Sequence, residues 1–167
     1  NGRCTYISSS VDTDRFIPTN TYENDRRIVI GWTGTFSSKP YLDLLRGVFT
    51  ELATKNDFVL RVIGNFQYEL PGVDLEVIQW SAIDEVKDLQ EIDIGVYPLV
   101  EEEWALGKSG LKAIQYMAFG IPTVATDYGT TREIIDHMED GWLVHTHSEW
   151  IDALERLLKE PSLREKL

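Results

Sequence analysis

Apolar residues occur along this chain in short runs that alternate with longer stretches of periodic spacing. The short runs are rich in Val, Ile and aromatic residues and end in Gly, Pro or polar residues, which predicts strands buried on both faces. We expect these strands at 26–33, 58–64, 75–80, 93–97, 123–125 and, at an edge, 141–144. Between them, apolar residues recur at helical spacing. We expect helices at about 41–55, 83–90, 109–119, 130–135 and 148–159.

Strands that alternate with helices in this way predict parallel pairing and right-handed crossovers, with helices on both faces of the sheet. The predicted fold is therefore α/β, a three-layer Rossmann-like parallel sheet flanked by helices. Ligands of such sheets bind outside the carboxyl ends of the strands. The residues expected around that crevice lie at 33–36, 64–65, 79–81, 98–100 and 126–129.

Sequence signals also predict how these helices begin, end and pack. Ser109 is predicted to cap the helix at 109–119, and Gly120 to end it. Two further starts are predicted, at Ser148 and at Thr130, which has Glu133 at the spacing of a capping box. The residues expected to face the core are Leu42, Leu45, Phe49, Leu52, Ile83, Val86, Leu89, Leu111, Ile114, Met117 and Ala118.

Lys108, Lys112 and Gln115 form a different stripe along the same helix, so their side chains can converge. The start of a helix already carries partial positive charge, which makes two lysines there unfavourable. A bound anion would relieve this conflict. The loop at Gly34 and Thr35 offers backbone N–H groups at the same predicted edge. Together these features predict a ligand that carries a diphosphate, held without a required metal.

Composition excludes several other classes. The chain has 167 residues, of which 43% are hydrophobic, and a formal net charge of −12, which suits one acidic globular domain without a nucleic-acid footprint. The lone Cys4 cannot form an internal disulfide, and we expect a cytoplasmic location. No apolar run approaches the roughly 20 residues of a membrane span. Because the chain begins with Asn, we expect a fragment. Residues 6–8 suggest a short strand and residues 8–21 a surface loop.

No nucleophilic triad is evident in the sequence. His145 and His147, or the acidic run at 101–103, could hold a metal ion, but no Cys or clear carboxylate cluster completes a site. Surface histidines and a solvated acidic loop are the favoured interpretations. Three aromatic residues could stack on a base or sugar or fill the core: Trp80, Tyr97 and Trp104.

Three stretches of the chain, 110–126, 129–135 and 140–144, resemble the C-terminal domain of family 4 retaining glycosyltransferases. The match extends upstream, where 11–18 is similar to the interdomain linker and 30–32 and 62–64 are similar to the first two strands. Members of this family have the GT-B fold, in which the active site lies between two Rossmann-like domains. The resemblance covers nearly the whole chain.

The resemblance implies that residues 1–25 are an interdomain linker and leading segment, and that 26–167 form the nucleotide-sugar donor domain. The acceptor-binding N-terminal domain would be absent, and the fragment alone inactive. The implied activity moves a sugar from a nucleotide diphosphate sugar to an acceptor such as a polysaccharide or lipid-linked glycan, with no cofactor required. The implied partners are the donor and the missing domain, through which alone the protein would associate with a membrane.

The chain departs from the family pattern at several positions. The family's Glu-x7-Glu motif falls on Gly107 and Gln115, and its strand-end Arg falls on Trp32. Its Lys-Gly pair is replaced by Lys39 and Pro40. The chain is similar instead to a divergent bacterial subgroup with the pattern Gly-Lys-x-Gly-x-Lys-x-x-Gln-Tyr-Met-Ala.

Lys108 and Lys112 are therefore expected to stabilise the leaving diphosphate. The expected substrate-binding residues are Gly34, Thr35, Lys39, Gly64, Trp80, Pro98, Ser109, Gly110 and Gln115, and no metal site is expected. The missing acidic pair leaves open a catalytically inactive module that binds a nucleotide sugar, and a GT-B sugar-nucleotide epimerase is a further alternative. A response-regulator-like receiver would need acidic residues at the end of the first strand, where Thr33 and Gly34 lie.

Overall fold

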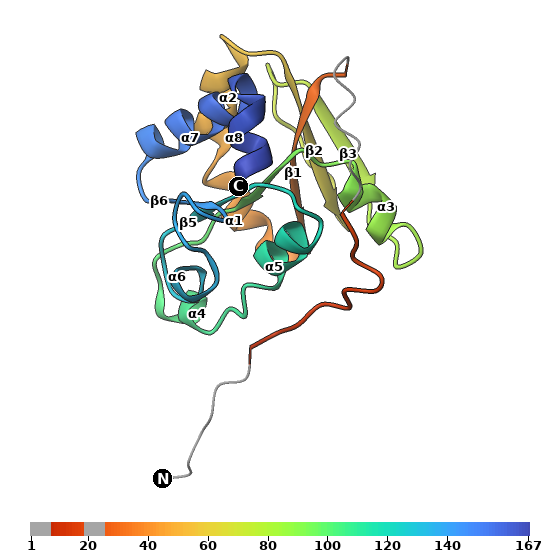
Figure 1. Ribbon diagram of the computed structural model, residues 1–167. Coiled ribbons are helices and arrows are strands. Elements are labelled where there is room, and N and C mark those ends of the chain that lie inside the picture. The colour runs from red at the N-terminus through yellow and green to blue at the C-terminus, as the bar shows by residue number, and fades with distance from the viewer. Residues whose placement is uncertain (1–7, 19–25) are drawn as a thin grey trace.

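The computed structural model describes residues 8–18 and 26–167. Six strands form one parallel sheet in the order β3-β2-β1-β4-β5-β6 (Figure 1). Their bounds are β1 Ile28–Gly34, β2 Phe58–Gly64, β3 Leu75–Gln79, β4 Ile94–Tyr97, β5 Thr123–Thr126 and β6 Trp142–Val144. The strand order reverses direction between β1 and β4, which is where such sheets bind ligands. The predicted Rossmann-like fold is confirmed, with β6 at an edge.

Helices cover both faces of this sheet. They are η1 Phe36–Ser38, α1 Lys39–Asp43, α2 Arg46–Ala53, α3 Glu85–Gln90, α4 Glu103–Leu106, α5 Leu111–Ala118, α6 Thr131–Ile134, α7 His147–Lys159 and α8 Pro161–Lys166. Side chains of α1, α2, α7 and α8 share one core cluster, and side chains of α3 and α5 share another. Figure 1 shows α2, α7 and α8 grouped together, away from α3. No helix in the described part of the chain is long and apolar enough to cross a membrane.

The central strand β1 lies deepest in the molecule. The five residues between its ends are buried, as expected for a strand with helices on both faces. Ile30 and Trp32 are almost fully enclosed in the core with Leu60 of β2. Each such side chain contributes about 1.5–3 kcal/mol when removed from water, so burial along β1 and β2 anchors the whole sheet.

The helix predicted at 41–55 is divided in two. The chain becomes helical earlier, at η1, and α1 and α2 are separated around Leu45. Leu44 N–H donates to Tyr41 O and Leu45 N–H to Leu42 O, which are the shorter hydrogen bonds of a tightened turn. The predicted core residues of this region are all buried: Leu42, Leu45, Phe49 and Leu52.

The core-facing stripe predicted for α5 is wrong at Leu111 but holds in part, because Met117 and Ala118 are half-buried and pack against core clusters. Leu111 is 39% exposed, and the buried positions are instead Ala113, Gln115 and Tyr116. The Tyr116 ring determines this orientation, because it packs against β4 where a Cβ on Gly95 would lie 2.5 Å from Cδ2 of the ring. The Tyr116 hydroxyl also accepts a hydrogen bond of 3.0 Å from the N–H of Thr33. The helix is therefore rotated to bury its tyrosine.

The end of α5 follows the prediction, but its start does not. Gly120 has φ +68° and donates to Met117 O, while Ile121 N–H donates to Tyr116 O, which together form a Schellman motif. At the other end, the predicted cap Ser109 is wrong. Gly110 occupies the N-cap with φ +69°, and no side chain caps the helix.

Two other predicted side-chain caps and one core position are also wrong, although Thr130 is the N-cap residue of α6 as predicted. The Thr130 side chain does not cap α6, because its hydroxyl donates to Lys108 O. The cap of α7 is Thr146, which forms a reciprocal capping box with Glu149, and Ser148 lies inside the helix. Ile83, predicted to face the core, precedes α3 and is 90% exposed.

The leading segment, residues 8–18, packs against the domain without regular secondary structure. Phe16 is 7% exposed, and its ring centroid lies 5.1 Å from that of Phe119. Arg15 donates to Ala82 O at 3.0 Å, and Gln90 donates to Ile17 O at 3.1 Å. The described part of the predicted loop is thus anchored to α3 and to the end of α5, and its residues 19–21 lie outside the described residues. Of the short strand predicted at 6–8, residues 6 and 7 lie outside the described residues.

Candidate functional site

Lys108 and Lys112 lie close to aromatic rings at the carboxyl ends of the strands. The Nζ atom of Lys112 lies 5.9 Å from the ring centroid of Trp32 and 5.8 Å from that of Tyr97, which come from β1 and β4. The Nζ atom of Lys108 lies 5.1 Å from the ring centroid of Tyr41. Each ammonium group therefore lies within cation–π distance of a ring.

Neither lysine is neutralised by a carboxylate in the described part of the chain. Burial, followed by the nearby charge of Lys108, lowers the pKa of Lys112 to about 8. Because the pKa is lowered, the charged form is disfavoured in the free protein, and an anion placed beside it would favour that form. The electrostatics of the pair therefore suit a negatively charged ligand.

The start of α5 adds backbone donors to this site. Gly110 has no side chain to accept from the first N–H groups of the helix, which also lack intrahelical acceptors. These donors and the helix dipole favour an anion at the same place as the lysines. Gly110 has a left-handed backbone with φ +69°, which favours glycine, and a Cβ there would also displace the end of the Ile134 side chain.

The loop after β5 supports the backbone at Lys108. The Thr130 hydroxyl donates to Lys108 O at 2.6 Å. The Thr131 hydroxyl donates to Thr126 O at 2.6 Å, and Leu99 N–H donates to the Thr126 hydroxyl at 2.8 Å. Sequence analysis did not identify these threonines as supports. Their partners lie up to 27 residues away in sequence, and no local pattern indicates such pairs.

The loop at Gly34 and Thr35 lies on the expected edge, but several of its N–H groups are used internally. Thr35 N–H donates to Ser38 Oγ at 3.0 Å, and Phe36 N–H donates to Asn65 Oδ1 at 3.1 Å. The ends of β1 and β2 approach so closely that glycine is needed at position 64, where a Cβ would lie 2.6 Å from Gly34 O. The lysines and α5 therefore offer a better anion site than this loop.

The remaining predicted residues fall into different environments. Lys39 is held by Asp43, with Nζ 2.9 Å from Oδ2, so it does not join the unpaired lysines. Gln115 is 9% exposed on α5, and Ser109 is half-buried. Pro98 is buried and lines a pocket of about 360 Å³ at the ends of β4 and β5.

A separate pocket of about 270 Å³ lies at the ends of β1, β2 and β3. Trp80 forms one wall with an indole that is 44% exposed, and its Nε1–H donates to Glu85 Oε1 at 3.3 Å. The lining residues are Thr33, Gly34, Thr35, Asn65, Trp80 and Glu85. Three of the predicted substrate-binding residues therefore share one pocket, while Glu85 was not anticipated.

The histidines do not come together as metal ligands. His145 Nε2 lies 2.9 Å from Glu101 Oε1, and His147 Nε2 lies 3.2 Å from Glu51 Oε2. Within the described ranges, no group of three or more His, Cys, Asp and Glu side chains is arranged to hold a metal ion.

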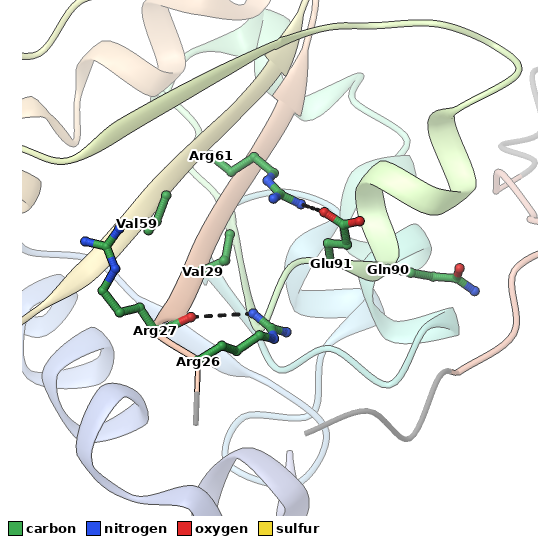
Figure 2. A pocket seen from close by; sticks show the side chains of 7 residues that line it. All are labelled: Arg26, Arg27, Val29, Val59, Arg61, Gln90 and Glu91. Carbon is green, nitrogen blue, oxygen red and sulfur yellow. Dashed lines mark hydrogen bonds and ion pairs between the residues drawn. The ribbon is translucent and has the colours of Figure 1, made fainter. Parts of the chain in front are cut away.

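A wider hollow of about 490 Å³ lies near the amino ends of β1 and β2, at the ends of the strands opposite to the lysine site (Figure 2). Its arginines are neutralised: Arg26 donates to both carboxylate oxygens of Asp93, at 2.8 and 2.7 Å. Arg61 reaches Glu91 at 2.8 Å, as Figure 2 shows. Because their charges are already paired, these arginines fit a structural role better than anion binding.

The fold and the unpaired cations at the switch point define a Rossmann-like α/β domain with a candidate anion site. The family model for Glycosyl transferases group 1 matches residues 27–160, and the chain belongs to this family. The fold is that of the C-terminal domain of a GT-B glycosyltransferase.

Individual relatives agree with this membership. A D-inositol 3-phosphate glycosyltransferase of Pseudarthrobacter chlorophenolicus is 30% identical over 128 residues, which is 75% of this chain. The match covers 29% of that relative, so this chain spans about three-tenths of its length.

Solved structures share the fold at lower identity. The C-terminal domain of a glycosyl transferase group 1 family protein from Francisella tularensis superposes with a TM-score of 0.70 at 22% identity, covering 94% of this chain and 92% of that one. Sucrose-phosphate synthase from Thermosynechococcus elongatus gives a TM-score of 0.67 at 16% identity, covering 94% of this chain and 44% of that one.

Proposed function

We propose that this chain is the donor-binding domain of a retaining glycosyltransferase. The whole enzyme would move a sugar from a nucleotide diphosphate sugar to an acceptor such as a polysaccharide or a lipid-linked glycan. The observation that carries this proposal is the Lys108–Lys112 pair, which lacks carboxylate partners in the described chain and lies beside the uncapped start of α5. Family membership and the sugar-transferring relative support it.

In this proposal the lysines act on the leaving group. Negative charge grows on the diphosphate as its bond to the sugar breaks. Two ammonium groups and the N–H groups of α5 then stabilise the developing charge without a metal ion. The rings of Trp32 and Tyr97 displace water near Lys112, and the lower local dielectric strengthens the attraction.

The acceptor would bind to a second domain that faces the same edge. Three large apolar side chains beside the site are exposed: Phe36 at 71%, Trp104 at 73% and Leu106 at 52%. Apolar surface of this kind is typical of a site that another domain covers. We propose a linker and leading segment at 1–25 and a donor domain at 26–167, with the described part of the leading segment packed against that domain.

The test is Lys112→Ala in the full-length enzyme. We expect donor turnover to fall by roughly 100-fold or more, as when a donor that stabilises transition-state charge is removed. Lys87→Ala, at an exposed position on α3, is the control and should leave turnover unchanged. Turnover by Lys112→Ala close to that of the unaltered enzyme would contradict the proposal.

A second candidate function is a nucleotide-sugar-binding module without catalysis. It is favoured by Gly107 and Gln115, which occupy the positions of the acidic pair expected from the family pattern. Calorimetric binding of a nucleotide sugar by the full-length protein, with neither transfer nor hydrolysis of the donor, would support this candidate over the enzyme.

A further inference from the structure

The pocket lined by Trp80 and Glu85 lies beside the lysine site, and the two share the end of β1. Trp32 contacts Lys112, and the next residue, Thr33, lines the pocket. Thr33 N–H is also held by Tyr116 of α5, the helix that carries Lys112. A ligand whose diphosphate lies at the lysines can therefore extend another part into this pocket.

The pocket suits a flat aromatic group. Its volume of about 270 Å³ is slightly below the roughly 300–1,000 Å³ typical of sites for drug-sized ligands, so it fits a base better than a whole nucleotide sugar. Trp80 offers a partly exposed indole for stacking. Two hydrogen bonds position Trp80: its backbone N–H donates to Gly64 O, and the indole Nε1–H donates to Glu85 Oε1.

The Glu85 carboxylate retains capacity to accept further hydrogen bonds. Oε1 accepts one weak bond of 3.3 Å from Trp80, and Oε2 lies 3.7 Å from the Arg15 guanidinium, beyond hydrogen-bond distance. Arg15 instead donates to Ala82 O at 3.0 Å. An ionised carboxylate has about four lone-pair positions, so Glu85 can still accept two parallel bonds.

The hydrogen-bonding edges of the bases differ in a way that this carboxylate can distinguish. Guanine presents N1–H and the N2 amino group side by side, and both donate to one carboxylate. Uracil presents a single N3–H between two carbonyl oxygens, which a carboxylate repels. Adenine and cytosine present one amino group next to an acceptor nitrogen. A site built around hydrogen-bond acceptors rejects bases without matching donors.

We propose that this pocket binds guanine, with Trp80 stacked on the base and Glu85 accepting from N1–H and the N2 amino group. The donor is then a guanosine diphosphate sugar. This inference rests on the proposed function, since it assigns the base of the same donor.

The experiment is calorimetric titration of the 167-residue chain with GDP, UDP, ADP and CDP. GDP should bind roughly 10- to 100-fold more tightly than the other three, as expected for one bidentate base contact. Tight binding of UDP, ADP or CDP, equal to that of GDP, would overturn the guanine assignment and leave the proposed function standing. Failure of all four to bind would count against the proposed function itself.

Glu85→Gln separates base recognition from simple charge. This variant should lose the preference for GDP, while its affinity for UDP, ADP and CDP stays within about 2-fold, because only the base contact of guanine is removed. Asp84→Asn removes the same charge from an exposed neighbour that does not line the pocket, and it should keep the preference. A uniform rise in affinity for all four nucleotides in Glu85→Gln would show that Glu85 only repels phosphate. An unchanged thermal midpoint would establish that the variant is folded.

Discussion

Lys112 is an ammonium group between two aromatic rings, with the like charge of Lys108 nearby and no carboxylate paired with it in the described chain. A charge in this setting costs the free domain stability, because burial removes water that would otherwise solvate it. A protein retains such a group where function requires it, and binding sites commonly sacrifice stability in this way. The cost should be visible as a dependence of stability on pH.

We expect the contribution of Lys112 to the stability of the free domain to rise as the pH increases from about 8 to 10.5. The folded pKa of Lys112 is about 8 and the ordinary value is 10.5. Between these values the unfolded chain binds the proton while the folded chain does not, so raising the pH favours folding. Below about pH 8 both states are protonated, and the full cost of the buried charge is present.

Urea unfolding of the unaltered chain and of Lys112→Met, measured across this pH range, isolates the effect. The difference in unfolding free energy between the two should shrink as the pH rises, because contributions of other groups cancel. At pH 7 the variant should be more stable by on the order of 2 kcal/mol. A constant difference across the range would mean that Lys112 is solvated in the folded protein.

At the scale of elements, the start of α7 shows how a neighbouring residue can take the role of a predicted cap. Thr146 has extended backbone angles and accepts from Glu149 N–H, while the Glu149 carboxylate accepts from Thr146 N–H at 2.9 Å. Ser148 lies one residue inside the helix, where its hydroxyl forms a hydrogen bond of 3.1 Å with that of Thr146. Both residues are acceptable caps, so sequence alone did not separate them.

Thr146→Ala should lower the unfolding free energy by about 1 kcal/mol, because the first turn of α7 loses a hydrogen-bond acceptor. Ser148→Ala is the matched control, and its effect should stay within about 0.5 kcal/mol. Chemical denaturation of both variants gives the comparison. A larger loss of unfolding free energy in Ser148→Ala than in Thr146→Ala would indicate that Ser148 caps α7.

At the scale of the whole molecule, the leading segment contributes to the fold. Phe16 is buried against Phe119, beside Ile121 and Leu89, in the core on the α3 and α5 face of the sheet. Residues 8–18 cover part of this core without forming a helix. The leading segment therefore forms part of the packed core, even though the proposed donor domain begins at residue 26.

Phe16→Ala should destabilise the chain by about 3 kcal/mol, since a buried ring is replaced by a cavity. Ile17→Ala, at a position that is 52% exposed, should change stability by less than about 0.5 kcal/mol. Thermal or urea unfolding measures both. If the two variants lose the same stability, the leading segment does not pack against the domain in solution.

The sequence by itself determined the class of fold and pointed to the carboxyl ends of the strands as the place of the candidate site. Strands made of continuous apolar runs are buried on both faces, which requires a sheet covered by helices on both sides. Parallel strands joined by helices also place their carboxyl ends on the same side of the sheet. The pair of Lys108 and Lys112 could also be identified from the sequence, because two cations at the start of a helix are a local signal. The resemblance to glycosyltransferases rested on local motifs as well, and family membership confirmed it.

Only the tertiary structure decided which faces and partners were used. The stripe at Leu111 and the ring of Tyr116 were both available to α5, and space above Gly95 selected Tyr116. Glu85 entered a pocket with Trp80 because α3 packs beside the ends of β2 and β3, which no spacing in the sequence reveals. Periodicity is a property of neighbouring residues, whereas burial and pairing depend on residues far apart in the chain.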